Sequence, residues 1–444
     1  MILEVACELR VIAMERPTTN DRIWTLLGQF LQVGLGIIVA PFIIRALSPD
    51  EYGLYAAFTS IGALFSLLNF GLSQSLELIV SKHGPRGDLR LIHGYYIAAR
   101  RVLVVRSLWS FPILAGTLLL YSSAKGNLLS PSVSFYALAF SLFIIIQLVQ
   151  ASQVSVFRGI GKVALASRMT LLGRAISVPV VILFLHLGYG FSALALAALI
   201  SSLIPLIQCD IYLSSLFEHC SAVGRPPAIV PLHSSGYSDQ LLDLSRQRGW
   251  TSVAVYFIIN SNSLLASIVM PLNVYGAYSL AQQLLQLLVN ASRYSLIASA
   301  PFLSNSAHRL DLASFGDCYR KCSRTSLLTY SLGSIFVAIF VSFLASSLNP
   351  HFHLLPLSVS ILLVFLYLLE VIHGNASLAL SCFDRIPFVK AAWLTGIAIN
   401  LLLLVAIFTN TASVFAFVLI QIICQLAYNA WKWPQELSRR LTTA

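Results

Sequence analysis

The chain alternates long apolar runs with short polar breaks, the pattern of a protein that crosses a membrane many times. Each run is close to the roughly 20 apolar residues that an α-helix needs to span a bilayer core. The runs lie at Ile23–Ile44, Gly53–Leu76, Ser107–Ser122, Val133–Phe157, Met169–Leu187, Phe191–Leu213, Trp250–Val269, Ala277–Leu303, Ser326–Leu348, Leu354–Leu380, Phe388–Phe408 and Thr411–Trp431. The pattern predicts an all-α polytopic membrane protein with about twelve transmembrane helices.

The first two runs form a predicted hairpin whose polar break reads Arg45-Ala-Leu-Ser-Pro-Asp-Glu-Tyr-Gly53. Proline and glycine are expected where one helix stops and a turn begins. The segment Tyr52-Gly53-Leu54-Tyr55 returns 223 residues later as Tyr275-Gly276-Ala277-Tyr278, about half of the 444-residue chain away. We therefore expect a duplication, because paired repeats around a central site are a common transporter plan. The predicted parts are a six-helix lobe at 1–217, a cytoplasmic linker at 218–249 and a second six-helix lobe at 250–444.

Composition agrees with a membrane protein. Hydrophobic residues make up 57% of the chain, charged residues only 10%, and the mean hydropathy is +0.82. These values exclude a soluble globular domain. The net charge of +11 is distributed through short loops rather than gathered in one patch, so no nucleic-acid partner is expected. The seven cysteines predict no disulfide framework, and no metal site or cofactor is expected.

The basic residues predict the orientation of the chain. When the sides alternate at each span, 25 of the 28 basic residues fall on one side, which the positive-inside rule assigns to the cytoplasm. The other side holds Arg45 and Lys125, and Arg293 lies within a span. Both termini are therefore predicted to be cytoplasmic.

The sequence favours a transporter over an enzyme. No phosphate-binding loop of the Gly-x-x-x-x-Gly-Lys-[Ser/Thr] type occurs, so ATP is not expected to drive the protein directly. The predicted outer loops are short, which disfavours a membrane-embedded glycan polymerase or ligase.

Polar side chains recur at helical spacing inside three of the predicted spans. The three sets are Gln282, Gln286, Asn290 and Arg293 in the eighth, Ser66, Asn69, Ser73 and Glu77 in the second, and Gln147, Gln150 and Gln153 in the fourth. Residues three or four apart share one helix face. Polar groups are costly in hydrocarbon unless they face protein or water, so we expect these stripes to line a central lumen that binds substrate. The alternative interpretation is hydrogen bonding between helices.

Arg293 is the sharpest candidate for binding an anion. Its guanidinium stays charged and its planar fork suits a phosphate group. The alternative is a buried ion pair with Glu77 or Glu370. Arg174 and Arg45 are further candidates for substrate contact, with snorkelling and interfacial anchoring as their respective alternatives.

Glu370 and His373 lie three residues apart in the tenth span and share a face. A carboxylate beside an imidazole is able to exchange a proton or help to hold a cation. We therefore predict that this pair, together with Glu77, couples transport to an ion gradient. The alternative is a neutral structural pair.

The first hairpin, from Leu26-Leu27-Gly28-Gln29 through Pro41 to Gly53, resembles Wzx-type O-antigen flippases and related polysaccharide transporters of the multidrug/oligosaccharidyl-lipid/polysaccharide (MOP) exporter superfamily. The resemblance implies a V-shaped pair of six-helix lobes whose cavity opens alternately to each side of the bacterial inner membrane. The implied cargo is an undecaprenyl-pyrophosphate-linked oligosaccharide, a repeat unit of O-antigen or a related surface polysaccharide. Membrane lipids and other polysaccharide assembly proteins are the implied partners.

On this resemblance Arg293 binds the pyrophosphate or an acidic sugar, and the Gln and Asn stripes meet sugar hydroxyls. The alternative within the same superfamily is a multidrug extruder coupled to sodium or protons. Such a protein is expected to carry more acidic residues within its spans than Glu77 and Glu370.

Overall fold

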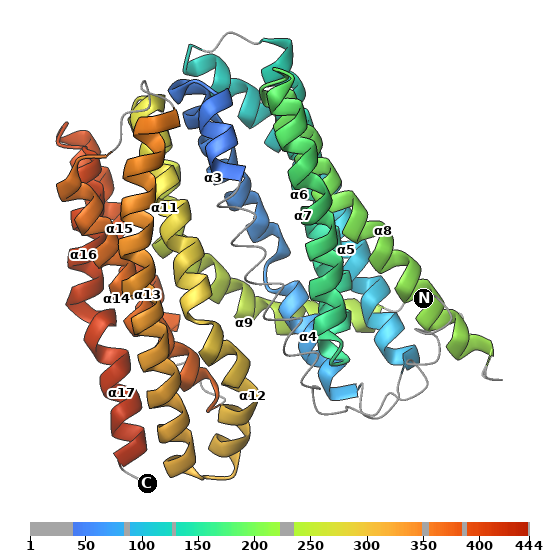
Figure 1. Ribbon diagram of the computed structural model, residues 1–444. Coiled ribbons are helices and arrows are strands. Elements are labelled where there is room, and N and C mark those ends of the chain that lie inside the picture. Colours follow the sequence, from blue (N-terminus) through green and yellow to red (C-terminus); the bar gives the residue numbers. More distant parts are fainter. Residues whose placement is uncertain are drawn as a thin grey trace. The chain divides into compact units, whose positions relative to one another are not determined.

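The computed structural model describes residues 39–83, 89–126, 130–222, 235–348, 355–383 and 389–442. Within these ranges the ordered elements are all helices (Figure 1). The elements are α3 (Pro49–Phe65), η1 (Ser66–Asn69), α4 (Leu72–His83), α5 (Leu89–Ala124), α6 (Pro131–Gly159), α7 (Val163–His186), α8 (Phe191–Ala222), α9 (Ser235–Ile259), α10 (Ser261–Val269), α11 (Leu272–Ser292), α12 (Tyr294–His308), α13 (Leu312–Leu348), α14 (Leu357–Ser381), α15 (Val389–Phe408), α16 (Val414–Cys424), the π-helix η3 (Gln425–Asn429) and α17 (Ala430–Thr442). An all-helical structure is what a bilayer requires, because a helix satisfies its backbone hydrogen bonds internally.

Helices occupy every predicted span from the second to the twelfth, and the first span falls largely outside the described residues. By length and composition, seven of the described helices are able to cross a membrane, or nine when each of two bent pairs is counted as one span. The eighth predicted span is divided between α11 and α12, and the ninth corresponds to α13.

The chain divides into two compact units. The first contains Ile61–Val253, and the second joins Gly36–Ser60 to Ala254–Ala444. The division near residue 253 lies close to the predicted start of the second lobe at residue 250. Part of the predicted linker is helical, because α9 begins at Ser235. Leu241 of α9 is fully buried in the core of the first unit.

Helix α3 begins at a capping box. The Ser48 amide donates to Glu51 Oε2 at 2.8 Å, and the Glu51 amide donates to Ser48 Oγ at 3.3 Å. Pro49 stands at the first helical position, where a missing amide hydrogen costs nothing. These reciprocal bonds satisfy two amides at the helix start. The polar break predicted from the sequence is therefore the start signal of a helix.

The repeated Tyr-Gly segments pack against each other in the second unit, where α3 meets α11. A Cβ on Gly53 would lie 2.0 Å from the Leu272 carbonyl oxygen, and a Cβ on Gly276 would lie 3.1 Å from the Gly53 nitrogen. Small residues at such a contact allow the two backbones to approach closely. Tyr275, the neighbour of Gly276 in the chain, has its Oη 2.6 Å from Ser60 Oγ and 2.9 Å from Ser263 Oγ.

The second span is broken in the first unit. Phe70 has a φ of 40° and Gly71 has a φ of 72°. The helix after the break is bent by 44° from the direction of the helix before it. Arg106 of α5 donates to the Leu68 carbonyl at 2.9 Å, and Arg248 of α9 donates to the Gln74 carbonyl at 3.1 Å. A helix break leaves carbonyls without intrahelical partners, so Arg106 supplies a hydrogen bond where the ladder is interrupted, and Arg248 adds one at the first turn of α4.

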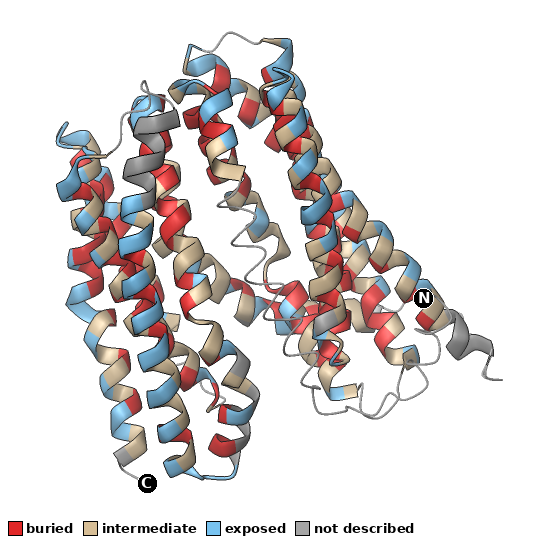
Figure 2. Ribbon diagram, viewed as in Figure 1, coloured by how far each residue is buried: buried red, intermediate tan, exposed pale blue. Residues whose placement is uncertain are grey.

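Buried residues lie where helices of one unit face each other, as the red positions in Figure 2 show. In the first unit Leu76, Leu103 and Val156 are fully buried in one cluster. In the second, Leu296, Phe315 and Ala379 are fully buried in another. Helix α13 exposes Leu332, with an exposed fraction of 69%, on its other face. Exposed apolar side chains on a spanning helix are those expected to meet lipid.

Candidate functional site

The strongest candidate site is built around Arg293 at the junction of α11 and α12. Helix α11 ends at Ser292 and α12 starts at Tyr294, so Arg293 occupies the break between them. Its amide still donates to the Val289 carbonyl at 3.1 Å, so the helical hydrogen bonding continues into this junction.

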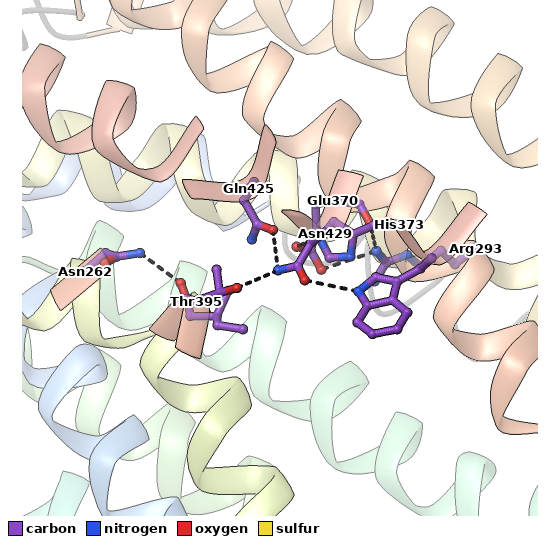
Figure 3. Close-up of polar contacts among 9 residues, drawn as sticks. Asn262, Arg293, Glu370, His373, Thr395, Gln425 and Asn429 are labelled. Atoms are coloured by element: carbon purple, nitrogen blue, oxygen red, sulfur yellow. Dashed lines mark hydrogen bonds and ion pairs between the residues drawn. The ribbon is translucent and has the colours of Figure 1, made fainter. Parts of the chain in front are cut away.

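The Arg293 guanidinium reaches α14, 77 residues away along the chain (Figure 3). Its Nη2 donates to Glu370 Oε1 at 3.3 Å and also to the Glu370 backbone carbonyl. The arginine and glutamate side chains are 17% and 15% exposed. A buried charge of this kind requires a partner, and Glu370 provides it.

His373 completes a cluster of three titratable or charged groups. Its Nε2 lies 3.0 Å from Glu370 Oε2, and its side chain is 13% exposed. The two carboxylate oxygens of Glu370 are thus divided between the guanidinium and the imidazole. Because α14 places residues three apart on one face, the sequence predicted the Glu370–His373 pair correctly. Arg293 Nε is buried and has no hydrogen-bond partner among the described residues, which leaves one donor available.

The other polar residues predicted in the eighth span have different surroundings. Gln282 is buried and donates to Tyr278 Oη at 2.9 Å. Gln286 is half-buried and Asn290 is exposed. Gln282 therefore bonds to a tyrosine of its own helix α11, and the Tyr278 hydroxyl also accepts a hydrogen bond from Gln421 of α16 at 3.4 Å.

A buried amide network in the twelfth span was missed by the sequence analysis. Asn429 donates to Thr395 Oγ1 at 3.2 Å and to Gln425 Oε1 at 3.0 Å, and it accepts a hydrogen bond from Trp433 Nε1 at 3.1 Å. Gln425 and Asn429 belong to the π-helix η3 (Figure 3). The signal was available, because Gln421, Gln425 and Asn429 follow one another at intervals of four. Single π-helical turns are frequent at functional sites.

The predicted residues of the first unit form separate contacts. Asn69 Oδ1 accepts hydrogen bonds from the Ser73 amide and hydroxyl at 3.0 and 2.9 Å, beside the break in the second span. Gln153 donates to Asp210 at 2.7 Å, and Asp210 forms an ion pair with Arg100 at 3.0 Å.

The remaining candidates differ in burial. Gln150 is buried and Glu77 is half-buried, whereas Gln147, Arg174 and Arg45 are exposed. Of the twelve predicted site residues, the structure brings Arg293, Glu370 and His373 together in one cluster.

Comparison with known families assigns the chain to a class of protein. A family model described as "Polysaccharide biosynthesis protein" matches residues 19–307, which is more than half of the chain. Among curated proteins no match was found.

Solved structures of similar fold are membrane transporters. An inward-facing multidrug resistance MATE family transporter of the MOP superfamily has a TM-score of 0.68 at 11% identity, covering 94% of this chain and 96% of that one. The outward-facing conformation of such a transporter has a TM-score of 0.60 at 11% identity, covering 97% of each chain. A MOP superfamily transporter from Pyrococcus furiosus has a TM-score of 0.55 at 13% identity, covering 96% and 99%. At these identities the similarity shows the fold alone, and it confirms the predicted fold class.

Proposed function

Because the chain belongs to the polysaccharide biosynthesis protein family and has the fold of MOP superfamily transporters, we propose that it is a flippase for a lipid-linked oligosaccharide. The cargo is an undecaprenyl-pyrophosphate-linked repeat unit of a surface polysaccharide, which crosses the bacterial inner membrane by alternating access. In this proposal both termini are cytoplasmic.

The observation that carries the proposal is the largely buried guanidinium of Arg293 at the junction of α11 and α12, within the eighth predicted span. A lipid-linked sugar presents two chemical groups that a membrane protein must accommodate, a pyrophosphate and a set of hydroxyls. An arginine holds a phosphate through paired hydrogen bonds. The half-buried Gln286 and the exposed Asn290 precede it on α11 and are the proposed partners for hydroxyls.

Glu370 holds Arg293 in the described structure and therefore occupies the position that an anionic group requires. We infer that the cargo pyrophosphate and the Glu370 carboxylate exchange on the same guanidinium. When the cargo takes Arg293, Glu370 loses a cation and retains His373, which favours uptake of a proton or a cation by the pair. This exchange links substrate binding to ion coupling. Glu77 remains a proposed second coupling residue in the first unit.

Deleting the gene in its host and complementing with wild type and Arg293→Lys tests the proposal. We expect the deletion to lose the surface polysaccharide and to accumulate the lipid-linked unit on the cytoplasmic side. Wild type restores the glycan, whereas the lysine variant restores it only in part because an ammonium lacks the planar fork. An unchanged glycan with new sensitivity to cationic drugs would contradict the proposal and identify a multidrug extruder.

A further inference from the structure

Gly374 lies one helical turn after Glu370 on α14, directly beneath the Arg293 guanidinium. A Cβ built on Gly374 would lie 1.9 Å from Arg293 Nη2 and 2.4 Å from Arg293 Cζ. Real Cβ atoms do not approach other heavy atoms so closely. The space that a side chain at position 374 would fill is therefore the space that the guanidinium occupies.

Glycine in the interior of a helix has a cost that needs an explanation. It destabilises a helix relative to alanine, because glycine loses more backbone freedom on folding. Gly374 is well inside α14, which runs from Leu357 to Ser381. Its φ is not in the left-handed region, so the backbone conformation does not require glycine. The close approach of Arg293 is the remaining reason on this face of the helix.

The location of the contact explains which groups Arg293 reaches. In an α-helix the carbonyl of residue 370 points toward residue 374, because hydrogen bonds run from each amide to the carbonyl four residues earlier. A guanidinium above Gly374 therefore meets the Glu370 carbonyl and, beside it, the Glu370 carboxylate. A methyl group at position 374 would push the guanidinium away from both.

We propose that Gly374 is a positioning residue for transport. Because it has no side chain, the Arg293 guanidinium packs against its Cα and stays within reach of Glu370; we call this contact the seat. Arg293 then leaves Glu370 to bind the anionic group of the cargo. The transfer of Arg293 to the cargo rests on the proposed function. The contact between Gly374 and Arg293 lies within the second unit and is testable without any cargo.

A double-mutant cycle on thermal unfolding tests the seat. The variants are Gly374→Ala, Arg293→Ala and the combination, purified in one detergent. We expect Gly374→Ala to lower Tm by about 4 °C or more in the wild-type background, because it displaces a buried guanidinium from its carboxylate. In the Arg293→Ala background the same change is expected to leave Tm within about 1 °C or to raise it, because the obstacle is gone and alanine favours the helix.

Gly116→Ala provides the matched control. Gly116 is also a helical glycine, in α5, and apart from its chain neighbours and the adjacent backbone of α5 no described heavy atom lies within 4 Å of its Cβ position. This variant should unfold at the wild-type temperature or slightly above it. If Gly374→Ala lowered Tm equally in both backgrounds, the loss would not depend on Arg293. The seat would then be rejected, and the cause would be packing of position 374 against other groups.

The same variants, reconstituted in lipid nanodiscs, test the link to cargo with undecaprenyl pyrophosphate as the probe. We expect Gly374→Ala and Arg293→Ala each to weaken binding by about tenfold or more, and the combination to weaken it no further. If the Tm values show that Gly374 and Arg293 are coupled but both single variants bind undecaprenyl pyrophosphate as tightly as wild type, the contact between the two residues is real and the proposed function is overturned. Gly374→Ala that weakens binding equally with and without Arg293 would overturn the positioning role.

Discussion

The two units contain helix breaks at corresponding positions, yet the two breaks differ in chemistry. Arg293 follows Phe70 by 223 residues, the same offset that relates Tyr275 to Tyr52. In the first unit the break at Phe70 is stabilised by arginines from other helices, Arg106 and Arg248, which donate to backbone carbonyls. In the second unit the residue at the break is itself the arginine, and its side chain holds a carboxylate.

From this difference we expect a structural role for the first break and a functional role for the second. At the first break the Arg106 guanidinium gives a hydrogen bond to a carbonyl of the interrupted helix, and Arg248 bonds to the first turn of α4. At the second break the guanidinium forms an ion pair with Glu370. Protonation of Glu370 weakens such a pair, and a competing anion is able to replace the carboxylate. The second break also keeps a buried Arg293 Nε without a partner in the described residues. We therefore expect the first break to determine stability and the second to determine transport.

The largest effect is expected at the second break. Arg293→Ala should abolish polysaccharide export and lower the free energy of unfolding by about 3 kcal/mol, because it leaves the Glu370 carboxylate without its cation. Adding Glu370→Gln should restore most of the stability, since it removes the unpaired charge, without restoring export. Export by the double variant, measured as surface glycan in the deletion strain, would contradict the separation of the two roles.

A smaller effect on stability, and little on export, is expected at the first break. Arg106→Ala leaves the Leu68 carbonyl without this donor and should cost about 2 kcal/mol, measured by denaturant or thermal unfolding. Surface glycan should stay within about twofold of wild type once expression is equalised. If Arg106→Ala abolished export at normal expression and stability, the first break would also belong to the transport site.

The smallest effect is expected in the amide network of the second unit. Asn429→Ala removes hydrogen bonds to Thr395, Gln425 and Trp433 and should cost about 1 kcal/mol, with export retained. Thermal unfolding together with surface glycan levels measures both quantities. Complete loss of export in a stably folded Asn429→Ala protein would extend the functional site from Arg293 into η3.

Much of the fold follows from the sequence, because a bilayer turns span prediction into a question of length and polarity along one dimension. The Tyr-Gly repeat and the Glu370–His373 pair were predictable for the same reason, since both depend on local spacing. The choice of Glu370 over Glu77 as the partner of Arg293 was not predictable, because it depends on how helices 77 residues apart pack.

The helix breaks show a further limit. Neither the Phe70 nor the Arg293 break contains proline, the usual signal, and Phe70 has a φ of 40° that residues other than glycine adopt only uncommonly. Once one break is known, however, the repeat offset indicates the other. The π-helix η3 had no compositional signal, although the spacing of Gln421, Gln425 and Asn429 marked a polar face within an otherwise apolar span.

The central claim is that the anionic group of the cargo binds at the Arg293 break and not at the Phe70 break. Hydrogen exchange measured by mass spectrometry on the nanodisc-embedded protein, with and without undecaprenyl pyrophosphate, tests it directly. We predict slower exchange in peptides covering 289–297 and 366–378, no change in 66–76, and loss of the effect in Arg293→Ala. Protection centred on 66–76, or protection of 289–297 that persists in Arg293→Ala, would contradict the claim.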